Sequence, residues 1–310
     1  MVAGLRLGIL TSGGDAPGMN AVIAGACESA ERLGGRTFGI HGGFAGLAEV
    51  RADPISSADA RARMHESGTW LGTSRWTALQ SPEGLATCHR ALRDLGLNAL
   101  LVIGGNGSAM GARALADGIP VAFVPATIDR DIGRSESTIG MDSAIGFAVA
   151  TIDQLRVTAH SLPGRAFLLQ TLGAPNGFLA DAVAAAAGID LVLVPERHID
   201  LDAVAAALRD LAPEGSAIAV MSEAVGDAVR LGEDLTERAG IRVHPTILGH
   251  AQRASAPSAH DRAMGQAAGR AAVDTLVNGR SSFISLGRDG TAKALTLNSD
   301  AGHPALDSAR

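Results

Sequence analysis

The chain has few cysteines, a single lysine and no tyrosine. Two cysteines, Cys27 and Cys88, are too few for a disulfide framework, so we expect reduced, buried thiols. Lysine and arginine together number 26, and Lys293 is the one lysine. It lies in no motif that suits a Schiff base or a P-loop, which disfavours chemistry based on a catalytic lysine.

Long apolar runs are also missing. None reaches the roughly 18 residues that a membrane-spanning helix needs. No basic region precedes the first apolar run, so we expect no signal peptide and predict a cytoplasmic protein. The net charge is −6 and no basic tract is present, which disfavours a nucleic-acid partner.

Short apolar runs alternate with helical-length segments over the 310 residues. Continuous apolar runs of this kind are typical of strands covered on both faces, and strand–helix alternation predicts parallel sheets with crossover helices. The sequence therefore predicts an α/β fold. Strands are expected at residues 5–10, 37–40, 99–103, 121–124, 166–170, 190–194, 217–221 and 283–286, and helices at 18–33, 83–95, 142–159, 179–187, 201–211 and 259–276, with Asp142 as a helix cap.

Two glycine-rich turns each follow an expected strand directly. The first contains Gly13 and Gly14, and the second contains Asn106, Gly107 and Ser108. Such turns expose backbone N–H groups to an anion, and the helix that follows adds a favourable dipole. On neighbouring parallel strands they indicate one phosphate-binding edge. Neither has the spacing of a P-loop or of a dinucleotide-binding fold, so an NAD-dependent dehydrogenase is disfavoured.

A third motif follows the strand at 121–124 and contains Thr127, Asp129 and Asp131. In phosphoryl transfer one carboxylate accepts the proton of the attacking hydroxyl, and others hold Mg²⁺ directly or through water. An isolated pair of aspartates is more often an acidic surface turn. Its position after a third strand favours the catalytic interpretation.

These three segments, in this order, resemble the bacterial 6-phosphofructokinases. The resemblance extends over about residues 5–300 and includes four further segments, 71–76, 194–196, 221–223 and 248–253. It implies two parallel-sheet, Rossmann-like domains facing a cleft. The nucleotide-binding domain would comprise 1–140 plus 251–300, the sugar-phosphate-binding domain 141–250, and 301–310 a C-terminal tail.

The resemblance also implies the activity. The chain would be a phosphotransferase that moves the γ-phosphoryl group of ATP to the 1-hydroxyl of fructose 6-phosphate or a closely related sugar phosphate, with Mg²⁺. Members are homotetramers or dimers, and Arg165 would reach the site of a neighbouring subunit.

Site residues follow from the resemblance position by position. The catalytic residues would be the base Asp129 with Thr127 and Arg75. The nucleotide would contact Gly13, Gly14, Arg75, Trp76, Asn106, Gly107, Ser108 and Gly111. The sugar phosphate would contact Thr127, Asp129, Asp131, Arg165, Leu172, Gly173, Glu223, His244, His250 and Arg253, and the metal Asn106 and Asp131. Three positions have another interpretation: Trp76 as a core-edge side chain, Glu223 as a solvated loop residue and His250 as a core histidine.

Four positions depart from the family's pattern. Asn106 replaces an aspartate, Ala174 an arginine, His244 an arginine and Arg130 an asparagine. The changes suit either a kinase adapted to another sugar phosphate or a non-catalytic regulatory homologue. The intact base motif favours a working enzyme. The sequence does not name the sugar, because loop contacts decide it.

The donor is a separate question. Members that use pyrophosphate usually carry larger charged residues at the positions of Gly107 and Ala126, so small residues there favour ATP. Asn106 and Ala126 are not the usual ATP-type residues, and pyrophosphate stays an alternative. Ala24 and Glu28 stand where relatives place effector-binding arginines, so weak regulation by such effectors is expected.

Overall fold

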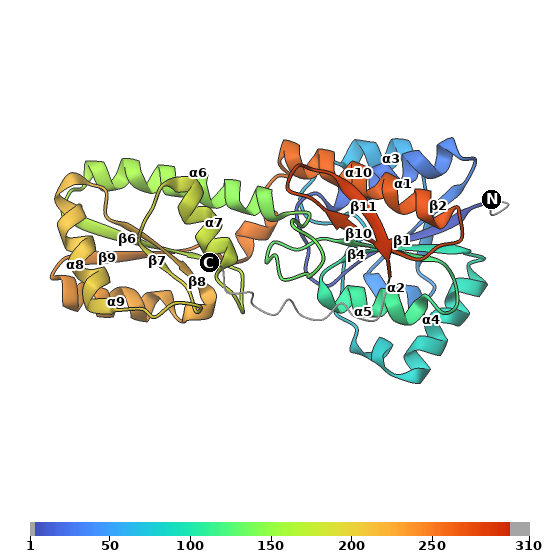
Figure 1. Ribbon diagram of the computed structural model, residues 1–310, viewed down its shortest axis with the longest axis horizontal. Helices are drawn as coiled ribbons and strands as arrows, with labels where there is room; N and C mark the ends of the chain where they lie inside the picture. Colours follow the sequence, from blue (N-terminus) through green and yellow to red (C-terminus); the bar gives the residue numbers. More distant parts are fainter. Residues whose placement is uncertain (1–3, 298–310) are drawn as a thin grey trace. The chain divides into compact units, whose positions relative to one another are not determined.

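A computed structural model describes residues 4–297, and the chain divides into two compact units (Figure 1). The first comprises the described residues up to Thr127, Asp131–Asp142 and those from Ala256 onward. The second comprises Ile128–Arg130 and Ser143–Ser255. Each unit has its own β-sheet.

The first unit is built on a seven-stranded sheet in the order β11-β10-β5-β4-β1-β2-β3. The central strands are parallel, whereas β3 and β11 pair antiparallel to their neighbours. Its strands are β1 (Arg6–Ser12), β2 (Arg36–Ile40), β3 (Ala52–Ile55), β4 (Ala99–Gly104), β5 (Val121–Pro125), β10 (Ser282–Leu286) and β11 (Ala292–Thr296). Its helices are α1 (Met19–Arg32), α2 (Gly43–Ala48), α3 (Ser57–Arg63), α4 (Pro82–Asp94), α5 (Asn106–Leu115) and α10 (Ala259–Leu276), with a 3₁₀ turn at Thr77–Gln80.

The second unit contains a four-stranded, wholly parallel sheet in the order β7-β8-β6-β9. Its strands are β6 (Arg165–Thr171), β7 (Val192–Leu193), β8 (Ile218–Ser222) and β9 (Arg242–Ile247). Its helices are α6 (Met141–Ser161), which begins in the first unit, α7 (Phe178–Ala187), α8 (Leu201–Leu211) and α9 (Ala228–Ala239), with 3₁₀ turns at Ala212–Glu214, Glu223–Val225 and Gly249–Ala254.

Buried strands and close helix packing hold the first unit together. All six residues of β4 and all five of β5 are buried, as expected for strands covered on both faces. Helices α1 and α10 pack closely along each other in Figure 1. A Cβ at Gly25 would lie 2.3 Å from the Gln266 carbonyl oxygen, and one at Gly269 would lie 2.2 Å from that of Val22. The two glycines therefore allow the close approach of the helix backbones.

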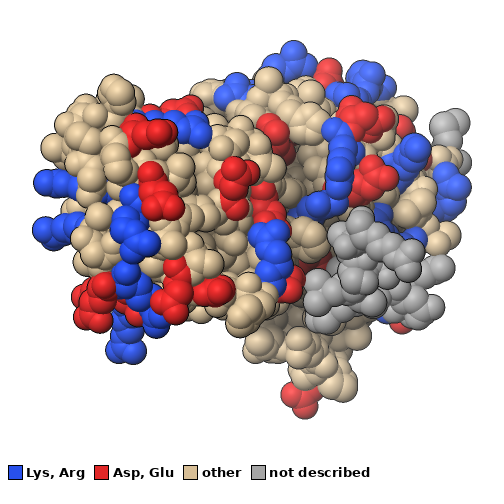
Figure 2. All heavy atoms as spheres, turned by 60° about the vertical axis from the view of Figure 1, so that its left-hand side comes forward, with Lys and Arg blue, Asp and Glu red and all other residues tan. Residues whose placement is uncertain are grey.

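The predicted α/β class with parallel sheets is confirmed, and α8 and α10 have the expected bounds. The expectation of Asp142 as a helix cap is wrong, because α6 begins at Met141 and Asp142 lies in its first turn. Segments β3, β9, β11, α2, α3, α5 and α9 were not expected. No helix among residues 4–297 is both long and apolar enough to cross a bilayer. Basic and acidic side chains are interspersed over the face in Figure 2.

Candidate active site

Three predicted motifs begin at the same edge of the first unit's sheet, although Ile128–Arg130 of the third motif belong to the second unit. Strands β5, β4 and β1 are consecutive and parallel, with Gly104 in register with both Ser12 and Pro125. Since parallel strands end at a common edge, the first residues of the turns after them lie beside one another. The expectation that the two glycine-rich turns follow neighbouring strands is confirmed.

Hydrogen bonds tie the first two turns together. The Ser108 hydroxyl, on a buried side chain, donates to the Ser12 carbonyl oxygen at 3.0 Å. Thr73 donates through its hydroxyl to the Gly13 carbonyl oxygen at 2.8 Å, and the Gly13 N–H donates to the Ser74 oxygen at 3.3 Å. Gly13 has a φ of 86°, a conformation that glycine adopts without strain. The turn after β1 is thus fixed by the 73–74 loop and by α5.

The start of α5 is suited to an anion. The helix begins at Asn106, is 10 residues long and has no side-chain cap on its N-terminal N–H groups. Uncapped N–H groups and the helix dipole favour a phosphate there. A Cβ at Gly107 would meet nothing within 4 Å. The space beside the first turn is therefore open.

Two residues predicted to contact nucleotide have packing roles. Gly111 is buried, and a Cβ there would lie 2.6 Å from Leu79 Cδ2 and 2.7 Å from Phe44 Cζ. Trp76 is partly buried and packs against the hydrophobic core that includes Phe44 and Leu79. The core-edge packing of Trp76 is confirmed, and its contact with the nucleotide stays a prediction. Arg75, the residue before Trp76, is exposed.

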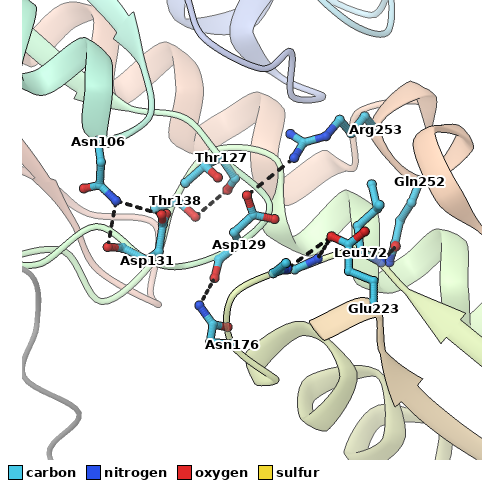
Figure 3. Close-up of polar contacts among 12 residues, drawn as sticks. Asn106, Thr127, Asp129, Asp131, Thr138, Leu172, Asn176, Glu223, Gln252 and Arg253 are labelled. Atoms are coloured by element: carbon cyan, nitrogen blue, oxygen red, sulfur yellow. Dashed lines mark hydrogen bonds and ion pairs between the residues drawn. The ribbon is translucent and has the colours of Figure 1, made fainter. Parts of the chain in front are cut away.

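Asp129 lies in a small polar cluster of the second unit (Figure 3). Its Oδ2 is 3.4 Å from Arg253 Nη2, and its side chain is 16% exposed. The Asn176 amide donates to the Asp129 carbonyl oxygen at 3.4 Å. A carboxylate paired with a guanidinium and still open to solvent can accept a proton from a bound hydroxyl. In the first unit, the Thr138 hydroxyl donates to the Thr127 carbonyl oxygen at 2.6 Å.

Glu223 holds the turn after β6. Its Oε1 accepts hydrogen bonds from the N–H groups of Gly173 at 3.0 Å and Ala174 at 3.1 Å. The solvated-loop interpretation of Glu223 is therefore wrong. Ala174 itself is exposed and carries no charge, so this turn presents backbone rather than a guanidinium.

Gln252 holds the same turn at its first residue. Its side chain is fully buried, its Oε1 accepts from the Leu172 N–H at 2.9 Å, and its Nε2 donates to the Ala144 carbonyl oxygen at 3.2 Å. Sequence reasoning assigned no role to Gln252 or Asn176. Their partners are far away in the chain, and only the position of Gln252 beside Arg253 signalled it.

Arg165 and His244 lie toward the other end of the four-stranded sheet. Arg165 begins β6, whereas Leu172 follows its end, so about 20 Å of strand separates them. His244 is in register with Phe167, and their rings stack with centroids 5.6 Å apart. Within one chain, the strand keeps Arg165 away from the turn at Leu172. His250 is exposed, which excludes the core-histidine interpretation.

The His244 side chain is unusual for a phosphate ligand. Its Nε2 is buried and has no hydrogen-bond partner among residues 4–297. Burial, followed by the charges of Arg242 and Arg165, lowers the pKa of His244 below its ordinary value. The imidazole is therefore neutral at physiological pH.

The two cysteines are buried and free, as expected. Burial raises the pKa of the Cys27 thiol to about 12 and that of Cys88 to about 11. Neither thiol is a nucleophile at neutral pH.

Comparison with known proteins defines the class. The model of the family described as Phosphofructokinase matches residues 6–276. The chain belongs to the phosphofructokinase family, and the resemblance seen in the sequence is confirmed.

Among curated relatives, the chain is 38% identical to the ATP-dependent 6-phosphofructokinase of Natranaerobius thermophilus over 89% of this chain and 87% of that one. It is 38% identical to ATP-dependent 6-phosphofructokinase 1 of Thermus thermophilus, over 90% and 88% of the two chains. Among solved structures, the pyrophosphate-dependent phosphofructokinase of Marinobacter aquaeolei has a TM-score of 0.87 at 19% identity, over 96% of this chain and 84% of that one. The last likeness concerns the fold alone.

Proposed function

We propose that the chain is an ATP-dependent 6-phosphofructokinase that transfers the γ-phosphoryl group of ATP to the 1-hydroxyl of fructose 6-phosphate. The observation that carries this is the Asp129 carboxylate, partly open to solvent and paired with Arg253, in a chain 38% identical to enzymes of that name over about nine tenths of its length. Phosphoryl transfer depends mainly on positioning and electrostatics, and the arrangement supplies both.

Each unit contributes its own residues. In the first, the uncapped start of α5 and the Gly13 turn bind the donor phosphates, and the exposed Arg75 neutralises charge on them. In the second, Arg253 orients the Asp129 carboxylate, which removes the proton from the acceptor hydroxyl. Glu223 and Gln252 hold the Leu172–Ala174 backbone in place. The first unit is thus the nucleotide-binding domain and the second the sugar-phosphate-binding domain.

Mg²⁺ is the metal that the residues fit. Asp131 Oδ1 is buried and has no hydrogen-bond partner among the described residues, and Mg²⁺ prefers one or two carboxylates together with donor phosphates. When bound, the ion neutralises charge on the phosphates. Asp131 would hold it, and a hydrogen bond from Asn106 ties Asp131 to the start of α5.

ATP rather than pyrophosphate is the proposed donor. The space beside Gly107 is open, and Ala126 is a small, buried residue. The open space beside Gly107 leaves room for the rest of a nucleotide beyond the β- and γ-phosphates, and Ala126 carries no charge.

The active enzyme is proposed to be a homo-oligomer in the cytoplasm. Arg165 and His244 lie toward the end of their sheet opposite the turn at Leu172, and strand geometry prevents Arg165 from reaching that turn in its own chain. A neighbouring subunit would therefore receive these side chains at its sugar-phosphate site.

The variant Asp129→Asn tests the base directly. It keeps the shape and removes the proton acceptor, so kcat should fall by several orders of magnitude while the KM for ATP changes little. Asp153→Asn, on the exposed face of α6, is the matched control and should retain full turnover. Nearly intact turnover in Asp129→Asn would show that Asp129 is not the base.

A further inference from the structure

The Asn106 amide makes two hydrogen bonds to one residue. Its Nδ2 donates to the Asp131 Oδ2 at 2.7 Å and to the Asp131 carbonyl oxygen at 3.1 Å (Figure 3). Both partners are acceptors, so the nitrogen and not the oxygen of the amide must face them. The contact uses both protons of the Asn106 NH₂ group and connects the first residue of α5 to the loop that follows β5.

The second carboxylate oxygen of Asp131 is in a different situation. Asp131 Oδ1 is buried, and residues 4–297 provide no hydrogen bond to it. A buried carboxylate oxygen without a partner is costly, and such atoms in proteins normally meet a donor, a water or a cation. The amide on Oδ2 thus fixes the carboxylate while Oδ1 stays available.

We infer that Asn106 is a positioning residue for Asp131. Its amide holds the Asp131 carboxylate without a metal, whereas two facing carboxylates would require a cation between them. Two carboxylates separated by 2.7 Å repel each other, and a cation between them or a shared proton relieves the repulsion. An amide at position 106 gives an attractive contact instead and removes one negative charge. The Asp131 loop therefore has its shape before any metal binds, and one carboxylate at this contact, not two, is left for the ion.

This inference deepens the proposed function, since it rests on Mg²⁺ as the metal of that site. It also explains how the chain tolerates an amide where the family has an aspartate. The amide makes the connection between α5 and the 131 loop without a cation. An aspartate at position 106 would need a cation to make the same connection.

The test is thermal unfolding of the whole chain in EDTA and in millimolar Mg²⁺, without nucleotide or sugar. Asn106→Asp should lower the midpoint in EDTA by about 5 °C, because a charge-assisted hydrogen bond is replaced by like-charge repulsion. Mg²⁺ should restore most of that loss. Asn106→Ala should also lower the midpoint, and Mg²⁺ should restore none of it, since the alanine offers the ion no second carboxylate.

Asn278→Asp is the matched control. The Asn278 amide is exposed at the end of α10 and donates to a single carbonyl oxygen, that of Asp274. Its midpoint should differ little from that of the unaltered chain and should respond to Mg²⁺ in the same way.

An unfolding midpoint of Asn106→Asp in EDTA equal to that of the unaltered chain would overturn the inference. So would a lowered midpoint that Mg²⁺ does not raise, or a rise with Mg²⁺ that is the same in Asn106→Asp and the unaltered chain. Turnover is not a readout here. A chain that shows this pattern but transfers no phosphoryl group would refute the proposed function and leave the role of Asn106 standing.

Discussion

Replacing Gln252 by leucine should destabilise the second unit and loosen the turn at Leu172–Ala174, which is proposed to contact the sugar phosphate. The leucine is close in size but leaves the buried Leu172 N–H without its acceptor and removes a second hydrogen bond to the Ala144 carbonyl oxygen, which lies within α6. The unsatisfied N–H costs about 1–3 kcal/mol, and the apolar replacement offsets part of that. We expect the free energy of unfolding to fall by about 2 kcal/mol.

Urea unfolding followed by circular dichroism measures the change, with the two units allowed separate transitions. Gln154→Leu, exposed on α6, is the matched control and should shift stability by less than about 0.5 kcal/mol. The KM for fructose 6-phosphate should rise in Gln252→Leu while that for ATP stays unchanged. A loss below about 1 kcal/mol would refute the reasoning, because it would mean that the buried Leu172 N–H finds another partner.

Four further outcomes follow from three residues. His244→Arg should lower the KM for the sugar phosphate about tenfold at neutral pH, where the imidazole is neutral, and affinity in the unaltered chain should rise relative to this variant as pH falls below the ordinary histidine range; equal KM values at all pH would contradict this. The lowered pKa means that the folded state disfavours the protonated imidazole. The free energy of unfolding should therefore fall as pH decreases, and a urea series from pH 8 to about 5 measures this decrease against His244→Gln, which lacks the imidazole. Gly107→Asp should raise the KM for ATP at least about tenfold, since the carboxylate enters the open space beside the α5 N-terminus; an unchanged KM would place the donor elsewhere. Glu223→Ala should lower the free energy of unfolding in urea by about 2 kcal/mol, and Glu223→Gln, which keeps the acceptor for Gly173 and Ala174, should lower it by less than half as much. Equal losses would show that the hydrogen bonds from Gly173 and Ala174 to Glu223 do not stabilise the turn.

The strands that the sequence predicted are those with continuous apolar runs, and all three that it missed are edge strands. β3, β9 and β11 each lie at a sheet edge. Pro54 and Pro245 lie within two of them, as edge strands tolerate, and both residues argue against a strand on sequence grounds. Most of β11 is exposed, so no buried face marks it.

The missed helix α5 has a similar cause. Gly107 and Gly111 are poor helix formers, and together with Gly105 they make the segment look like a turn. The structure uses Gly111 for packing against Leu79 and Phe44. A packing requirement of this kind comes from residues distant in the chain, so local propensity does not reveal it.

The candidate site was predictable where it follows from strand order. Asp129 and the glycine-rich turns were found because they follow strands, and parallel strands end together. The side chains that fix the site were not found. Gln252 holds Leu172 across 80 positions of the chain, and Glu223 holds Gly173 across 50. Only the fold brings such partners together.

The central claim is phosphoryl transfer from ATP to fructose 6-phosphate with Asp129 as the base. The most direct measurement is a coupled assay of ADP release from ATP and Mg²⁺ with fructose 6-phosphate, beside a panel of other sugar phosphates and with pyrophosphate as an alternative donor. Turnover with ATP and fructose 6-phosphate that Asp129→Asn abolishes is the predicted result. Turnover with another sugar alone would reassign the acceptor and direct attention to Ala174 and His244, and no turnover with either donor on any sugar would contradict the account.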